Sequence, residues 1–400
     1  MWIQEKKPCW WGVVGLACAM VGVGCAPYVG PREPMDYPVF GLKVRTGIEK
    51  GQSEGSVPQG FSRPLSMNEI GLLQVTPDQP LMSDEVGIVS TDVLTGSFNA
   101  NVASGSTLLM ELRVRFRQEF NTTVPSEWTP WVRIAWAGKK PAAKQSLLDD
   151  RLGSVEIDEL RLKRKTDRMQ VRLRLESDDR NAVATVSRID IPIANRYYGD
   201  VERGAEKIAP IDIPVPFRSQ KTSDGSLSGR LCSPTSVAMV LAYYGVDATV
   251  EEVAKKCYDP EYDIYGNWPR NIQAAYEFGV PGSLVRMQSW REVGKILETG
   301  QPLIISIRAE RGELRGAPYD ATEGHLIVLR GMDEFGNLIV NDPACGTAED
   351  GKRAYRRSDL TKVWLKATNG TAYLLGTPEM VQKARYRWNK EQNTSAERGR

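Results

Sequence analysis

The sequence predicts an all-β sandwich domain followed by an α+β domain. Two observations carry this prediction: apolar and polar residues alternate with a period of two through residues 61–200, whereas helical apolar stripes followed by strand patterns occupy residues 208–376. The length of 400 residues accommodates two domains and an N-terminal extension.

Three strands of the first domain have the clearest alternation, at residues 108–116, 132–136 and 169–175. Apolar side chains occupy every second position, and most residues between them are polar or charged. This pattern is typical of a half-buried strand with one solvated face. Turn residues separate the strands and no helical period interrupts them, which favours two packed sheets. We expect the arginine-rich faces to be solvated.

Three tryptophans, Trp128, Trp131 and Trp136, lie close together in this first domain. Aromatic side chains of this size usually bury most of their surface, so we predict that they fill the core. The alternative is a surface on which the β-sandwich contacts carbohydrate.

The second domain begins with helices. Residues 234–244 place apolar side chains on one stripe and are followed by a glycine, as at many helix ends. Capping-box patterns at 249–252 and 289–292 each open a further helix, and Pro269 suits the first turn of a helix between them.

Strand patterns follow the helices, and the chain ends in a polar tail. The predicted strands are residues 303–307, 325–330, 338–341 and 372–375. Helices first and an antiparallel sheet afterwards indicate an α+β domain. We expect the tail, residues 377–400, to be frayed or weakly helical.

The N-terminus resembles an export signal. Residues 1–25 contain two lysines and then a mostly apolar run at 10–24, which is short for a membrane span of roughly 20 residues. The small residues before Cys25 predict cleavage and lipidation at that cysteine, with a plain cleaved signal or an uncleaved anchor as alternatives. Residues 26–60, rich in proline and glycine, are typical of a flexible linker.

Composition excludes several function classes. The formal net charge is +2, so no global electrostatic argument favours nucleic acid as a partner. His325 is the only histidine, which excludes a zinc site built on several histidines, and the six cysteines form no Cys-x-x-Cys pair. We predict neither a metal nor a cofactor.

Cys232, His325 and Asp342 could form a catalytic group. Cys232 stands where a helix begins, and the free backbone N–H groups there lower the pKa of a thiol. A turn at residues 333–337 would join the strands that carry the other two, and in a hairpin centred near residue 335 paired residue numbers add to roughly 670. Asp342 would then lie close to His325. Each residue also suits a structural role, so spacing alone leaves that alternative open.

Four separated segments resemble those of papain-like peptidases of family C39, in the same order. They are Gln220 with residues 232–241, then 264–271, 323–331 and 340–344. The resemblance covers about residues 210–376, is closest to the secreted, stand-alone bacterial branch, and does not extend to the first domain. It implies a papain-like cysteine peptidase fold for the second domain.

The resemblance also implies roles for individual residues. Cys232 would be the nucleophile, His325 the general base and then acid, and Asp342 the residue that orients the imidazole. Gln220 would donate its side-chain amide to the oxyanion, and Trp268 would line a substrate pocket, with a core or lid role as the alternative. Ser233 stands where glycine is common, which predicts a narrower cleft.

These features predict an exported cysteine hydrolase that cleaves peptide or amide bonds through a thioester. Its partner would be a peptide or a cell-wall-derived amide, and it would touch a membrane only through a lipid anchor at Cys25. Two alternatives remain: a catalytically silent binding module of the cell envelope, and a cysteine amidase or transpeptidase that acts on peptidoglycan.

Overall fold

The computed structural model describes residues 39–40, 65–66, 73–83, 85–116, 127–145, 148–194, 209–221, 225 and 227–398. Of its two compact units, Met1–Asp36 lies outside these residues, and Tyr37–Arg400 contains everything discussed below. The predicted signal segment, Cys25 and nearly all of the predicted linker therefore lie outside the described residues. None of the helices in the described part is both long and apolar enough to cross a membrane.

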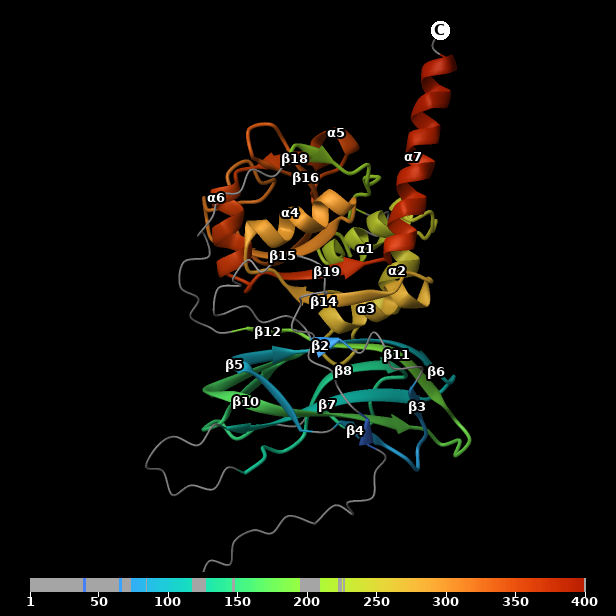
Figure 1. The fold of residues 1–400 in the computed structure, drawn as a ribbon, viewed down its shortest axis with the longest axis vertical. Helices are drawn as coiled ribbons and strands as arrows, with labels where there is room; N and C mark the ends of the chain where they lie inside the picture. The colour runs from blue at the N-terminus through green and yellow to red at the C-terminus, as the bar shows by residue number, and fades with distance from the viewer. Residues whose placement is uncertain are drawn as a thin grey trace, which may run out of the picture. The chain divides into compact units, whose positions relative to one another are not determined.

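The first region is built of strands in two sheets (Figure 1). The larger sheet contains β1 (Val39–Phe40), β4 (Leu81–Ser83), β5 (Val86–Thr95), β7 (Thr107–Phe116), β8 (Val132–Gly138), β9 (Gly153–Glu156), β10 (Glu159–Glu176) and β12 (Ile193–Ala194). The smaller sheet contains β2 (Leu65–Ser66), β3 (Leu73–Val75), β6 (Ser97–Val102) and β11 (Ala184–Ile191). One apolar cluster includes side chains from both, such as Phe98 and Ile189 from the smaller sheet and Leu108 and Val171 from the larger. We call residues 73–194 the β region.

The outer face of β7 and β10 is not the solvated surface that the alternation predicted. Glu111 and Arg172 are buried there, and the carboxylate of Glu111 accepts hydrogen bonds from Arg172 Nε at 2.8 Å and Arg174 Nε at 2.9 Å. Burial would raise the pKa of Glu111, but the two arginines outweigh it and lower that pKa. The prediction failed because a buried charged face and a solvated one have the same alternation.

Of the three tryptophans, Trp136 is buried as predicted, whereas Trp128 and Trp131 do not fill the core of the β region. Trp128 and Trp131 are half-buried outside the apolar cluster, and the guanidinium of Arg113 lies 5.0 and 4.5 Å from their ring centres. Trp136 is buried, but a register shift between β7 and β8 interrupts the alternation, so that Ile134 belongs to the cluster and Trp136 does not. A carbohydrate contact at these rings stays a prediction.

The first part of the second region is mostly helical (Figure 1). Its helices are α1 (Cys232–Tyr243), α2 (Val250–Cys257), α3 (Trp268–Glu277) and α4 (Trp290–Thr299). The capping box of α2 is confirmed: Thr249 Oγ1 accepts from the backbone N–H of Glu252 at 3.1 Å, and the Glu252 carboxylate accepts from that of Thr249 at 2.8 Å. Ser289 caps α4 through the backbone N–H of Glu292, but the Glu292 carboxylate accepts from the backbone N–H of Gln288 at 2.9 Å, so α4 has the serine cap without the reciprocal bond of the predicted capping box.

An antiparallel sheet follows, in the order β14 (Gly282–Arg286), β19 (Thr371–Leu375), β15 (Leu303–Ala309), β16 (Thr322–Met332), β17 (Leu338–Asn341) and β18 (Lys352–Tyr355), with β13 (Ile211–Asp212) beside β16. The β16–β17 hairpin pairs Val328 with Asn341 and Met332 with Leu338, which agrees with the predicted register. Sequence patterns missed β13, β14, β18, the short helices α5 (Ala348–Gly351) and α6 (Arg357–Leu360), and the π-helix η1 (Thr361–Lys366).

The tail is a helix, α7 (Pro378–Arg398), along most of its length. Its first turns are fixed to the second region, because Val381 and Ala384 are buried and the guanidinium of Arg387 donates to the backbone oxygen of Tyr243. The polar composition of the tail therefore did not indicate that the first half of α7 packs against the second region.

The β region is bonded directly to the second region. Asn99 exchanges two hydrogen bonds with the backbone of Gly282, both at 3.0 Å, and the side chain of Gln273 exchanges two with the backbone of Ala100, at 3.0 and 2.7 Å. Paired bonds of this kind fix the distance and the orientation of the two backbones. Strand β6 is thus held against β14 and α3.

Candidate active site

Cys232 is the first residue of α1, and its side chain is nearly buried, with 9% of the residue exposed. Two serines of the first turns fix the helix here. Ser236 Oγ donates to the backbone oxygen of Leu326 at 3.0 Å, and Ser233 Oγ lies 2.9 Å from the hydroxyl of Tyr373. Ser233 is itself fully buried, so it does not narrow the cleft as predicted.

His325 and Asp342 are in direct contact. Nε2 of His325, on β16, lies 2.8 Å from Oδ1 of Asp342, which directly follows β17. Asp342 is fully buried, and it also accepts from the hydroxyls of Tyr319 and Tyr355 at 3.1 and 3.0 Å and from the backbone N–H of Ala344 at 3.0 Å. These bonds fix one orientation of the carboxylate. Sequence patterns did not predict the two tyrosines, because neither lies in the matched segments.

The three groups shift one another's pKa values. Burial would raise the pKa of Cys232, but its hydrogen bond with His325, the charge of that imidazole and two backbone N–H groups outweigh it and lower the pKa. Burial would lower the pKa of His325, but Asp342 and Cys232 raise it to about 10. The pKa of Asp342 is lowered, because the bonds to His325 and other donors outweigh burial. These directions favour a thiolate–imidazolium pair beside an ionised carboxylate.

Gln220 is joined to the segment that carries Asp342. Its backbone N–H donates to the oxygen of Pro343 at 2.9 Å, and the neighbouring Ser219 hydroxyl donates to the oxygen of Cys345 at 2.6 Å. The side chain is buried, and its Oε1 has no hydrogen-bond partner among the described residues. That oxygen can only accept a hydrogen bond, so the role of the side-chain N–H groups in binding an oxyanion stays a prediction.

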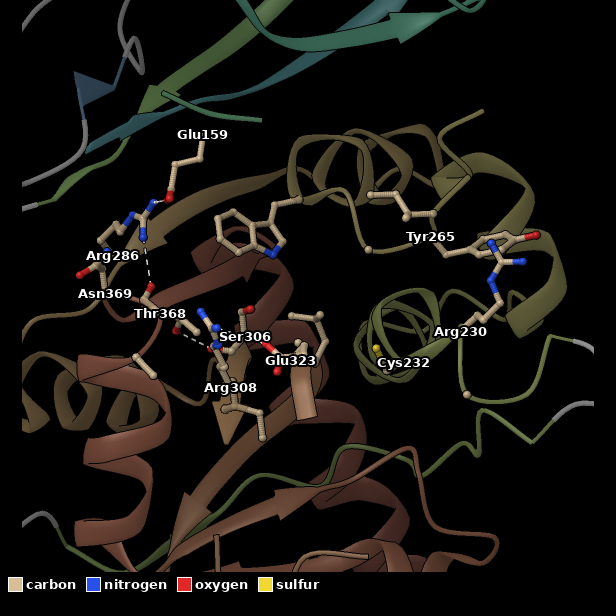
Figure 2. Close-up of a pocket in the computed structure, with 18 of the residues that line it drawn as sticks. Glu159, Arg230, Cys232, Tyr265, Arg286, Ser306, Arg308, Glu323, Thr368 and Asn369 are labelled. Carbon is tan, nitrogen blue, oxygen red and sulfur yellow. Dashed lines mark hydrogen bonds and ion pairs between the residues drawn. The ribbon is translucent and has the colours of Figure 1, made fainter. Parts of the chain in front are cut away.

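A pocket of about 380 Å³ has Cys232 in its wall. Trp268, at the start of α3, lines the same pocket, and its backbone N–H donates to Asp158 Oδ2 of the β region at 2.9 Å. Figure 2 shows Cys232 on α1 at one side of this pocket and Glu159 with Arg286 at the other. The structure therefore places two predicted site residues, Cys232 and Trp268, in the wall of one pocket, while His325 is buried and does not line it.

The β region also contributes residues to the wall of the pocket, which the sequence did not predict. Glu159 and Arg161, the first and third residues of β10, line it together with residues of the second region. Their spacing is that of an ordinary strand face, so no local signal marked them. Among the described residues, no three His, Cys, Asp or Glu side chains gather closely enough to hold a metal ion.

Residues 212–372 match the model of the Peptidase_C39 like family. This segment, about two fifths of the chain, is similar to that family. The match confirms the resemblance that the four sequence segments predicted, and it supports a cysteine peptidase, a hydrolase. No curated protein matches the chain.

Two solved structures are similar to the chain. One is a C39-like peptidase from Bacillus anthracis, with 19% identity and a TM-score of 0.33 over 42% of this chain and 98% of that one. The other is a double glycine motif protease from an AMS/PCAT transporter in complex with the leader peptide, with 21% identity and a TM-score of 0.28 over 42% and 98% of the two chains.

Proposed function

We propose that the protein is a cysteine peptidase in which Cys232, His325 and Asp342 form the catalytic triad. The observation that carries this proposal is the 2.8 Å contact between His325 Nε2 and Asp342 Oδ1, beside a thiol whose pKa the imidazole of His325 lowers. Because Nε2 is bonded to Asp342, Nδ1 is the nitrogen available to the sulfur of Cys232. This chain of contacts is the arrangement that nucleophilic catalysis requires.

In the proposed reaction the Cys232 thiolate attacks the carbonyl carbon of an amide, and the carbonyl oxygen becomes an oxyanion. The backbone N–H of Cys232 and the side chain of Gln220 would donate to that oxygen. As the C–N bond breaks, the imidazolium of His325 gives its proton to the leaving amine, and a thioester remains. His325 then takes a proton from water, the resulting hydroxide attacks the thioester, and the acid and the thiolate are released.

A peptide library tests this proposal. The full-length mature protein is incubated with internally quenched peptides, and new amino termini are identified by mass spectrometry. We expect cleavage that stops when Cys232 is alkylated. If Cys232 is alkylated quantitatively and cleavage continues, the triad is not the source of activity. If no peptide or cell-wall amide is cleaved, the chain is the silent binding module instead.

We also propose that the protein is exported and lipidated at Cys25. The supporting features are the lysines and apolar run of residues 1–24 and the small residues before the cysteine. A Cys25→Ser variant is expected to leave the membrane fraction or to keep its unprocessed N-terminus, as judged by fractionation and immunoblotting. Finding the unprocessed wild-type chain in the cytosol would overturn both parts of the proposal.

For the β region we propose a two-sheet sandwich. The apolar cluster shared by the two sheets supports it, because packed sheets bury their inner faces together. The paired hydrogen bonds to Gly282 and Ala100 support a fixed attachment of this region to the peptidase part.

A further inference from the structure

The β region forms part of the wall of the pocket that contains Cys232. Glu159 and Arg161 of β10 line this pocket, and β14 and the loop before β19 supply the residues next to them. A segment outside the matched family residues, 212–372, thus reaches the proposed catalytic site.

Glu159 is a buried carboxylate held between two guanidinium groups. It forms ion pairs with Arg286, on β14, and with Arg161 Nε at 2.6 Å, and its side chain is only 4% exposed. Burial would raise the pKa of Glu159, but the two arginines outweigh it and lower that pKa, so the carboxylate stays ionised. Arg286 is equally buried and donates to Thr371 Oγ1 at 2.7 Å. These two groups neutralise each other.

Arg161 is the exposed member of this group. Its side chain is 39% exposed, and its Nε is shared between Glu159 and, at 3.2 Å, the exposed Glu156. Among the described residues the two terminal nitrogens of Arg161 have no hydrogen-bond partner, whereas a guanidinium can donate five hydrogen bonds. The β region therefore presents to the pocket a guanidinium cation whose terminal N–H groups have no acceptor among the described residues.

The other charges of the pocket do not cancel this cation. Of its lining residues, Asp263 is bonded to Arg230 at 3.0 Å, and Glu323 lies 3.2 Å from Arg308. Both acidic side chains are largely exposed to solvent, where water screens them. Asp263 and Glu323 are thus each paired with an arginine of the pocket, and Arg161 adds a further lining cation that contacts Glu159 and Glu156 through its Nε.

We propose that Arg161 binds a carboxylate of the substrate, so that the enzyme prefers peptides or amides with an acidic group near the scissile bond. This inference rests on the proposed function, since it assumes that the pocket receives the substrate. The planar guanidinium suits a carboxylate because two parallel N–H groups can donate to its two oxygens. Arg161 is a specificity residue, not part of the catalytic group.

Binding to a variant that cannot turn over tests the proposal separately from activity. Full-length mature protein carrying Cys232→Ala is titrated with pairs of acetylated, amidated hexapeptides that differ only by Glu or Gln at one position, and fluorescence anisotropy gives Kd. We expect the Glu peptide of at least one pair to bind about tenfold more tightly, as a charge-assisted hydrogen bond allows. Adding Arg161→Gln should remove that difference, and Arg161→Lys should restore part of it.

Lys163→Gln is the matched control, because it removes the same charge from an exposed position of β10 that does not line the pocket. Its Glu preference should equal that of the unaltered chain. Equal binding of every Glu and Gln pair, a preference that survives Arg161→Gln, or tighter binding of Lys peptides would each overturn the proposal. Failure of the intact protein to cleave any peptide would refute the proposed function while leaving a measured Glu preference in place.

Discussion

Cys232 is expected to react with iodoacetamide well below pH 8, and His325→Ala is expected to move that reaction to higher pH. The thiolate is the reactive form, and the bond to His325 lowers the pKa of the thiol below its ordinary value. Without the imidazole, burial is the largest remaining influence and raises that pKa. The same variant should lose peptide cleavage by a factor on the order of a thousand or more. Alkylation rates across pH and initial rates of cleavage measure the two effects.

Cys257 provides an internal control for this experiment. It is fully buried, and burial raises the pKa of its thiol, so it should stay unlabelled in the native protein. A Cys257→Ala, Cys345→Ala variant isolates the signal of Cys232 among the thiols that the structure describes. If Cys232 in that variant reacts only with a pKa near its ordinary ~8.5, or does not react at all, the proposed triad is wrong.

The pH dependence of cleavage follows from the directions in which the pKa values of Cys232, His325 and Asp342 are shifted. The thiolate–imidazolium pair forms as pH rises through the lowered pKa of Cys232 and is lost as pH rises through the pKa of His325, which Asp342 and Cys232 raise to about 10. Asp342 stays ionised across that range because its pKa is lowered. Activity should therefore hold a broad plateau between an acidic and a basic limb.

Local rules predicted the part of the site that lies within one stretch of chain. The turn at residues 333–337 set the register of β16 and β17, and that register brings Asp342 to His325. The start of α1 was placed to within two residues, which fixed Cys232 at a helix terminus. Hairpins and helix ends are encoded in neighbouring residues, so these positions could be derived from the sequence.

The contacts between distant segments could not be derived in this way. Nothing near Glu159 in the sequence indicates that its partner is Arg286, which lies 127 residues further along the chain. Tyr319 was equally hidden, because its bond to Asp342 depends on how the segment between β15 and β16 folds back. Trp136 is buried as predicted, but it lies outside the apolar cluster of the β region, because the register shift between β7 and β8 breaks the alternation.

The ion pair of Glu159 and Arg286 links the β region to the second region at the wall of the pocket. Both side chains are almost fully buried, at 4% and 2% exposed. Next to Glu159, the fully buried Asp158 accepts from the backbone of Trp268, and burial raises the pKa of that carboxyl to about 7. The two regions therefore meet at a buried ion pair. Loss of either partner leaves the other charge buried and unpaired, which lowers the stability of the contact.

Arg286→Met is accordingly expected to lower the free energy of unfolding by about 3–5 kcal/mol, since it leaves the Glu159 carboxylate buried without its buried cation. Adding Glu159→Gln should recover much of that loss, because it removes the charge that has been left without a partner. Arg308→Met is the control: this arginine lines the same pocket but is 57% exposed, so its replacement should change stability by less than about 0.5 kcal/mol. Urea unfolding followed by tryptophan fluorescence gives the three values. An Arg286→Met protein as stable as the wild type would mean that the other bonds between the two regions, such as those at Gly282, Ala100 and Trp268, hold them together, and that the buried ion pair contributes nothing net to their attachment.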